Sequence, residues 1–195
     1  MKKRLFPALL LSALLTACAT TGTGQNAAGI TDSRAPIMSA AREGQTATIR
    51  ALLDQGTDPN ASDKYGWTPI MFAARDGHID IVRLLIERGA NINAAQTGGK
   101  TAGSTPLMWA AFSGHTDIAR LLLDKGAHIN ATDKNGATAL MLAAAMCRTD
   151  TARLLIEKGT NIHVVGTATP ITALGLAEAA GCPEIAQMLK AVGRK

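Results

Sequence analysis

Residues 68–94, TPIMFAARDGHIDIVRLLIERGANINA, contain two short amphipathic segments separated by a turn. Thr68 and Pro69 are typical of a helix start, because a threonine hydroxyl can accept a bond from a free backbone N–H and proline at the first position needs no such bond. Asp76-Gly77-His78 interrupts the helical pattern, and Gly89 is placed to end the second segment in a left-handed conformation. The stretch predicts a helical hairpin with one apolar side, which needs neighbours to bury it.

The same pattern is found five times along the chain. Its opening recurs at residues 35, 68, 105, 138 and 172, at spacings of 33 to 37 residues, and glycines that end the second segment stand at 56, 89, 126 and 159. This period resembles the ankyrin repeat, a helical hairpin of 33 residues. The resemblance covers residues 34 to 193 and implies an all-α ankyrin-repeat solenoid of about five helix-turn-helix repeats with short β-turn or hairpin loops. The expected repeats span residues 34–66, 67–103, 104–136, 137–170 and 171–195.

One departure from the family pattern is consistent. Methionine replaces the signature histidine in four copies, at Met38, Met71, Met108 and Met141. A thioether fills irregular gaps well, so we expect these side chains to pack between stacked hairpins. A shared copper site is not predicted, because methionines one repeat apart are too far apart to hold one ion.

The N-terminus has the pattern of a bacterial lipoprotein leader. A basic start, Met1 to Arg4, precedes an apolar run of 11 residues, Leu5–Leu15, which is too short to span a bilayer as a helix. Leu15-Thr16-Ala17-Cys18 resembles the lipobox, in which the cysteine carries the lipid, including palmitate. We therefore expect a signal peptide at 1–17, a lipidated Cys18 with a flexible tether at 18–33, and a repeat domain at 34–195.

The residue after Cys18 is alanine rather than the aspartate linked in that family to inner-membrane retention. The resemblance thus implies anchoring in the envelope, with the outer membrane favoured and the repeats in the periplasm. The leader holds three of the 20 basic residues, which leaves 17 against 15 acidic residues, a formal charge of only +2. Nucleic-acid binding is disfavoured by this balance, and no small-molecule substrate is indicated.

Charged and polar residues also follow the repeat. Arg50, Arg83, Arg120 and Arg153 precede an acid by four residues, which favours ion pairs within each second helix. Asn60, Asn93 and Asn130 follow the glycine stops and are expected to bond loop backbones along the stack. His163 replaces the asparagine in the next copy, so this ladder is expected to weaken near the C-terminus. The loop at residues 96–103 is four residues longer; its Gly99-Lys100-Thr101 lacks the glycine and strand of a phosphate-binding loop.

No catalytic constellation is evident. The four histidines are dispersed without zinc-ligand spacing, and no nucleophile motif is found, so we expect no enzyme activity, no metal and no cofactor. Cys147 and Cys182 lie in neighbouring inter-helix turns. A disulfide there requires Cα atoms within about 4.4–6.8 Å, and hence local bending of helices packed about 8–10 Å apart. Both a disulfide and two free thiols are compatible with the sequence.

Protein partners of the family bind at loop tips and at the first-helix surface. Carried onto this chain by the resemblance, the contact residues are Lys64, Tyr65, Trp67, Arg75, Asp76, Thr101, Ser104, Phe112, Ser113, Lys134, Asn135, Ala145 and Met146. Tyr65, Trp67 and Phe112 are the favoured contacts among the aromatics, because Trp and Tyr are common interface anchors. Phe72 and Trp109 share a first-helix position and are expected to pack.

Three roles follow from the resemblance. The first is a lipid-anchored periplasmic scaffold that binds an unidentified protein and supports an oxidative-stress enzyme such as catalase. The second is an immunity protein that neutralises a periplasm-delivered toxin. The third is a structural spacer in the cell envelope.

Overall fold

The structure is a computed structural model that describes residues 35–168 and 170–193. In these residues there are helices and no strands, as the sequence pattern predicts. The helices are α2 (Ala35–Arg42), α3 (Thr46–Asp54), α4 (Pro69–Asp76), α5 (Ile79–Glu87), α6 (Pro106–Ser113), α7 (Thr116–Asp124), α8 (Ala139–Ala145), α9 (Thr149–Glu157), α10 (Ala173–Ala180) and α11 (Pro183–Val192). Each expected repeat therefore contains one helix pair.

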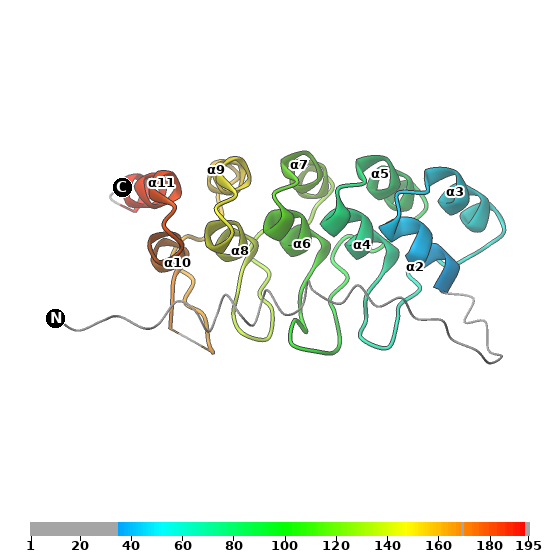
Figure 1. Cartoon of the computed structure of the whole chain (residues 1–195), viewed down its shortest axis with the longest axis horizontal. Coiled ribbons are helices and arrows are strands. Elements are labelled where there is room, and N and C mark those ends of the chain that lie inside the picture. Colours follow the sequence, from blue (N-terminus) through cyan, green and yellow to red (C-terminus); the bar gives the residue numbers. More distant parts are fainter. Residues whose placement is uncertain (1–34, 169, 194–195) are drawn as a thin grey trace. The chain divides into compact units, whose positions relative to one another are not determined.

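The helix pairs of the repeat unit stack side by side in two layers (Figure 1). The first helices of the pairs, α2, α4, α6, α8 and α10, form the inner layer. The second helices form the outer layer, and long loops extend from the inner side (Figure 1). Each helix contacts its own partner and the equivalent helices of adjacent pairs, which is the neighbour-only arrangement of a solenoid.

Threonines begin most of the inner helices. The hydroxyl oxygens of Thr105, Thr138 and Thr172 accept bonds from the backbone N–H three residues later, at 3.4, 3.3 and 3.2 Å. Thr68 differs, because its side chain makes no capping bond and its hydroxyl is buried without a partner. The expectation of a Thr68 side-chain cap was wrong; Pro69 starts that helix through its fixed φ.

Small side chains bring the inner helices together. Ala73 and Ala74 of α4 are fully buried, and alanines occupy the equivalent positions in α6 and α8. Larger residues, such as Ile81 and Leu85 of α5, fill the space between the layers. The four methionines are at most 9% exposed, which confirms their packing role. The Met141 sulfur also accepts the backbone N–H of Thr138 at 3.4 Å.

Two further sequence expectations concern the ends of helices and loops. Gly89 and Gly126 follow outer helices with φ of 85° and 94°, which confirms the left-handed stops. The asparagine ladder is confirmed as well. The Asn93 amide donates to the Gly126 carbonyl at 3.3 Å and accepts from the His128 N–H at 2.8 Å, so one side chain links two repeats.

The expected leader, the lipidated Cys18 and the tether fall in residues 1–34, outside the described part of the chain. Among the described residues, no helix has both the length and the apolar character needed to cross a bilayer.

Candidate functional site

The loops carry the predicted contact residues at their tips. The Asp63 carboxylate accepts bonds from the backbone N–H groups of Tyr65 and Trp67, at 2.8 and 2.9 Å. Asp133 makes the equivalent two bonds, both 2.8 Å, in the loop before α8. Such turns fix the backbone, so the residue after each aspartate, Lys64 or Lys134, projects from an ordered tip.

Successive tips are joined by backbone hydrogen bonds. The Thr97 N–H donates to the Tyr65 carbonyl at 3.1 Å, and the Lys134 N–H donates to the Ala102 carbonyl at 2.8 Å. The next pair of tips is linked in the same way. We call these linked loop tips the tip row, defined as residues 64–66, 97–103, 133–136 and 165–168. Its backbone is held in register by the stack beneath it.

An aromatic cluster lies next to the tip row. It comprises Trp67, Phe72, Trp109 and Phe112. The Trp67 ring stacks on those of Phe72 and Trp109, with centroids 4.7 and 4.6 Å apart, and Trp109 meets Phe112 edge-on at 6.0 Å. Stacked and edge-on pairs contribute about 0.5–1.5 kcal/mol each beyond the area they bury. The cluster therefore forms a rigid connection between the second and third repeats.

Arg75 covers one side of the aromatic cluster. Its guanidinium carbon lies 5.0 Å from the Trp67 centroid and 5.2 Å from that of Phe72. Two bonds of 2.8 Å to the adjacent Asp76 carboxylate fix the guanidinium in this position. Both side chains remain about a quarter exposed, so this pair is accessible from solvent.

The structure divides the predicted contact residues into three groups. Lys64, Tyr65 and Lys134 are exposed, with 47% exposure for Tyr65. The half-buried group comprises Trp67, Arg75, Asp76, Thr101, Phe112, Ser113, Asn135 and Met146. Ser104 and Ala145 are 3% and 8% exposed, so their assignment to an accessible surface was wrong.

The predicted roles of the aromatic residues agree with the structure only in part. Trp109 is 8% exposed, as expected of a packing residue. Trp67 packs more than expected: its ring stacks on two others, and its indole N–H lies 2.6 Å from the Gln96 amide oxygen in the amide orientation that satisfies both groups. The sequence position of Trp67 is on a loop, but in the structure its ring packs against the rings of Phe72 and Trp109.

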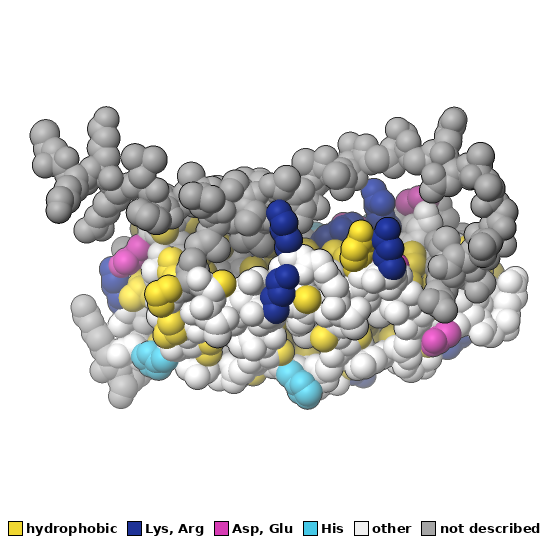
Figure 2. Space-filling model, turned by 90° about the horizontal axis from the view of Figure 1, so that it is seen from below, with side chains coloured by type: hydrophobic (Ala, Val, Ile, Leu, Met, Phe, Trp, Pro, Cys, Tyr) yellow, Lys and Arg dark blue, Asp and Glu magenta, His cyan; other side chains and the backbone are white. Residues whose placement is uncertain are grey.

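Charge on the loop side is uneven. Lys64, Lys100 and Lys134 are exposed on consecutive tips, and the Lys134 ammonium donates to the Gly99 carbonyl. Asp63 and Asp133 bond to their own loop backbones. Figure 2 shows this side: Lys and Arg side chains stand out from its middle beside apolar ones, and visible Asp and Glu side chains lie toward its ends. The exposed tips therefore present cationic side chains next to an aromatic ring.

The inter-helix turns form a second stack. His78 Nε2 lies 3.1 Å from the Arg42 carbonyl of the preceding turn, and His115 Nε2 lies 3.1 Å from the Arg75 carbonyl. Each imidazole occupies the space beside a glycine with positive φ; a Cβ on Gly77 would stand 2.6 Å from the His115 ring. The glycine is thus required both by its backbone conformation and by the side chain stacked against it.

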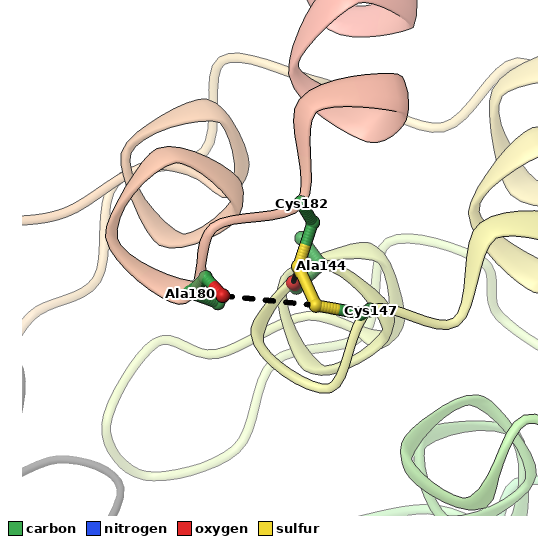
Figure 3. The surroundings of a disulfide bond; sticks show 4 residues. All are labelled: Ala144, Cys147, Ala180 and Cys182. Carbon is green, nitrogen blue, oxygen red and sulfur yellow. Dashed lines mark hydrogen bonds between the residues drawn. A yellow bond between two sulfur atoms is a disulfide. The ribbon is translucent and has the colours of Figure 1, made fainter.

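The fourth and fifth repeats use cysteines at these same two positions. Cys147 replaces the turn glycine with φ 54°, the only non-glycine residue with positive φ among those described. Cys182 replaces the stacking histidine, and the two sulfurs form a disulfide with a Cα–Cα distance of 5.5 Å (Figure 3). No bending of helices is needed, because the cysteines lie in stacked turns rather than in the helices.

The ion pairs of the outer layer differ from expectation. Asp54 pairs with Arg88 and Asp124 with Lys158 of the following repeat, both at 2.7 Å. Arg153 contacts Asp150 at 3.3 Å and Glu184 at 2.6 Å. None of the four predicted pairs four residues apart forms a salt bridge; Asp54 and Asp124 pair with a cation of the next repeat instead.

The described residues offer no cluster of three or more His, Cys, Asp or Glu side chains that could hold a metal ion. The pKa of the Asp124 carboxyl is lowered from its ordinary value by a hydrogen bond from Lys158. The nearby charges of Lys158 and Arg120 act in the same direction. This side chain is 52% exposed, so it belongs to an ion pair of the outer surface.

Sequence reasoning missed two features of the site. It did not foresee that the turn histidines bond to the preceding turn, although the repeated Gly-His pair is the signal of that contact. It also missed Arg148, which replaces a turn histidine and donates to the Phe112 carbonyl at 3.1 Å. The guanidinium thereby supports the backbone beneath the aromatic cluster.

Comparison with known proteins identifies the repeat. A search of curated proteins finds no match. The family model described as ankyrin repeats (3 copies) matches residues 9–96 and 95–166, well over half of the 195 residues. Proteins built from these repeats generally act as non-catalytic protein-interaction modules. Together with the stacked helix pairs, this match shows that the chain belongs to the ankyrin-repeat family.

Proposed function

We propose that this chain is a non-catalytic scaffold, anchored in a bacterial envelope through lipid on Cys18, which binds a protein through the tip row and the adjoining aromatic cluster. The observation that carries the binding surface is the exposed Tyr65 ring with the Lys64 ammonium 5.0 Å from its centroid. This pair sits on a tip whose backbone is fixed by Asp63 and by the next loop. Little ordering is therefore required when a partner docks there.

The charges indicate the chemistry of the partner. Three lysines on consecutive tips are exposed, and the two tip aspartates accept bonds from the backbone. A partner surface with carboxylates complements this pattern, and such charges act mainly on association rate and specificity. Binding is therefore expected to weaken as salt rises, since exposed charges are screened within about 8–10 Å at physiological ionic strength.

The binding proposal is tested with the full chain used as bait in an envelope extract. We expect a captured protein to be lost when Lys64→Glu and Tyr65→Ala are combined, with unchanged thermal unfolding. Lys125→Glu, an exposed charge change on the outer layer, is the matched control and is expected to retain capture. Equal capture by both variants would place the binding surface elsewhere.

The anchor is tested separately, since residues 1–34 carry it. Cells expressing the full chain with labelled palmitate should give a labelled band that fractionates with membranes. Cys18→Ser should abolish both the label and the membrane fractionation. A Cys18→Ser chain that still fractionates with membranes would contradict the lipid anchor.

The identity of the captured protein separates the finer roles. Capture of catalase or a related enzyme would support the oxidative-stress role. We propose this role first because of the expected periplasmic location. Capture of a toxin supports immunity. Co-sedimentation with purified cell wall, without a captured protein, supports a structural spacer.

A further inference from the structure

We propose that the Cys147–Cys182 disulfide is a thiol–disulfide exchange site, at which an external dithiol attacks Cys147 and releases the C-terminal helix pair α10–α11. The inference is independent of the proposed partner surface, because the cysteines lie in the inter-helix turns and not in the tip row. The two sulfurs of this disulfide differ in their surroundings.

Exposure decides which sulfur is attacked. Cys147 is an exposed residue, whereas Cys182, at the start of the following helix (Figure 3), is 6% exposed. A thiolate must reach a sulfur directly to exchange with a disulfide, so access selects the point of attack. Cys147 therefore receives the incoming thiolate, and Cys182 becomes the leaving thiolate.

The position of Cys182 favours its departure. It is the residue immediately before α11, where the first backbone N–H groups of the helix are free of intrahelical partners. A cysteine at a helix N-terminus has a lowered thiol pKa, and a thiol of lower pKa leaves faster. Glu184 in the first turn opposes this effect, but its carboxylate is paired with Arg153 at 2.6 Å.

The other charged groups beside Cys182 also form a pair. Lys190 and Glu178, which line the surface hollow next to Cys182, bond to each other at 2.7 Å. Their charges therefore largely offset one another at the sulfur. The N-terminus of helix α11 is then the local feature that favours the thiolate, and the burial of Cys182 opposes it.

The exchange is balanced with a dithiol as the reductant. Its first thiolate bonds to the Cys147 sulfur while the disulfide breaks, and the electron pair remains on Cys182, which then takes up a proton. The second thiolate of the reductant then attacks the reductant sulfur bonded to Cys147, which closes a disulfide in the reductant and releases Cys147 as a thiolate that takes up a proton. The reductant is oxidised by two electrons, and the cystine is reduced to two cysteines.

Reduction removes the covalent link between the fourth repeat and the helix pair α10–α11. In the reduced chain Cys147 keeps a side chain at a positive φ, where Gly44, Gly77 and Gly114 stand in the other turns. Among the described residues, the helices of the fifth repeat contact a neighbouring pair on one side, through α8 and α9. The disulfide thus adds a covalent link where the earlier turns have a histidine-to-carbonyl bond, and its loss leaves only the weaker contacts of the Cys182 and Cys147 sulfurs with the Ala144 and Ala180 carbonyls, at 3.5 and 3.9 Å.

The test uses the full chain carrying Cys18→Ser, which leaves two cysteines of the three. With dithiothreitol in the absence of denaturant, the reduction rate should rise in proportion to thiol concentration. A rate that stops rising at the rate of unfolding would overturn the proposal, since reduction would then require loss of the fold. Brief treatment with glutathione and acid quenching should give an adduct on Cys147, and an adduct on Cys182 would refute the assigned direction.

Two further measurements separate exchange from a purely structural link. In the chain with Cys18→Ser and Cys147→Ser, thiolate absorbance should show the Cys182 thiol ionising at lower pH than free cysteine, and ionisation at the pH of free cysteine would contradict the leaving-group argument. On reduction, amide exchange should rise at least severalfold in α10 and α11 and stay unchanged in α4 to α6. Unchanged exchange in α10 and α11 would show that the disulfide does not control their release.

Discussion

Gly77→Ala tests the physical reason for the stacked turns. Gly77 has φ of 89°, and a Cβ there would stand 2.6 Å from Cε1 of His115. Gly89 is the matched control, because its φ is 85° and nothing lies within 4 Å of the position of its Cβ. Both changes carry the backbone penalty, and only the first displaces a stacked side chain.

The expected magnitudes follow from these two environments. A left-handed conformation costs a residue with Cβ about 1–2 kcal/mol, so Gly89→Ala should destabilise by that amount. Gly77→Ala adds overpacking, about 1–3 kcal/mol. It also weakens the His115 bond to the Arg75 carbonyl, a bond worth about 1 kcal/mol net. We therefore expect Gly77→Ala to lower the free energy of unfolding by about 2–5 kcal/mol.

Urea unfolding of the full chain, followed by circular dichroism, measures both variants. A double variant with His115→Ala removes the obstructing ring, so it should be less destabilised than the sum of the two single changes by about 1 kcal/mol or more. Equal destabilisation by Gly77→Ala and Gly89→Ala, with additive effects in the double variant, would refute the stacking argument.

Other predictions address the ladder, the aromatic cluster and the outer ion pairs. Asn93→Ala should lower the free energy of unfolding by about 1–3 kcal/mol in urea titrations, because it leaves loop groups of two repeats unsatisfied. Trp67→Ala should lower the melting temperature and weaken the near-ultraviolet dichroism, whereas Tyr65→Ala should leave both nearly unchanged. The ordinary pKa of Asp124 is 3.8 and pairing lowers it, so its contribution is present above pH 3.8 and lost as pH falls through the folded value. The stability difference between wild type and Lys158→Met should therefore shrink below pH 3.8, and a difference that grows there would contradict the pairing.

Local signals were sufficient for the regular features of the fold. The Thr-Pro openings, the apolar spacing and the glycine stops are each set within one repeat, so they could be predicted without coordinates. The asparagine ladder was also predictable, because the same residue recurs at the same step of the stack. Thr68 shows the limit of this reasoning, since a good capping residue makes no bond when its hydroxyl is buried away from the free N–H.

The candidate site was harder to predict because it depends on neighbours between repeats. Tyr65 and Trp67 are two positions apart in the same loop, yet one is 47% exposed and the other stacks between two rings. Ser104 follows the long loop but is buried by its return to α6. Which side of a loop faces solvent depends on the adjacent loop, and no property of the single segment reveals it.

The sequence by itself determined the repeated helical hairpin, the number of its copies and the absence of a recognisable catalytic motif. The tertiary structure decided how the hairpins meet: which ring turns inward, which acid pairs with the next repeat, and that Cys147 and Cys182 lie 5.5 Å apart at Cα. The physical reason is that helix formation depends on residues a few positions apart, whereas contacts between turns depend on residues more than thirty positions apart that meet only in the packed stack.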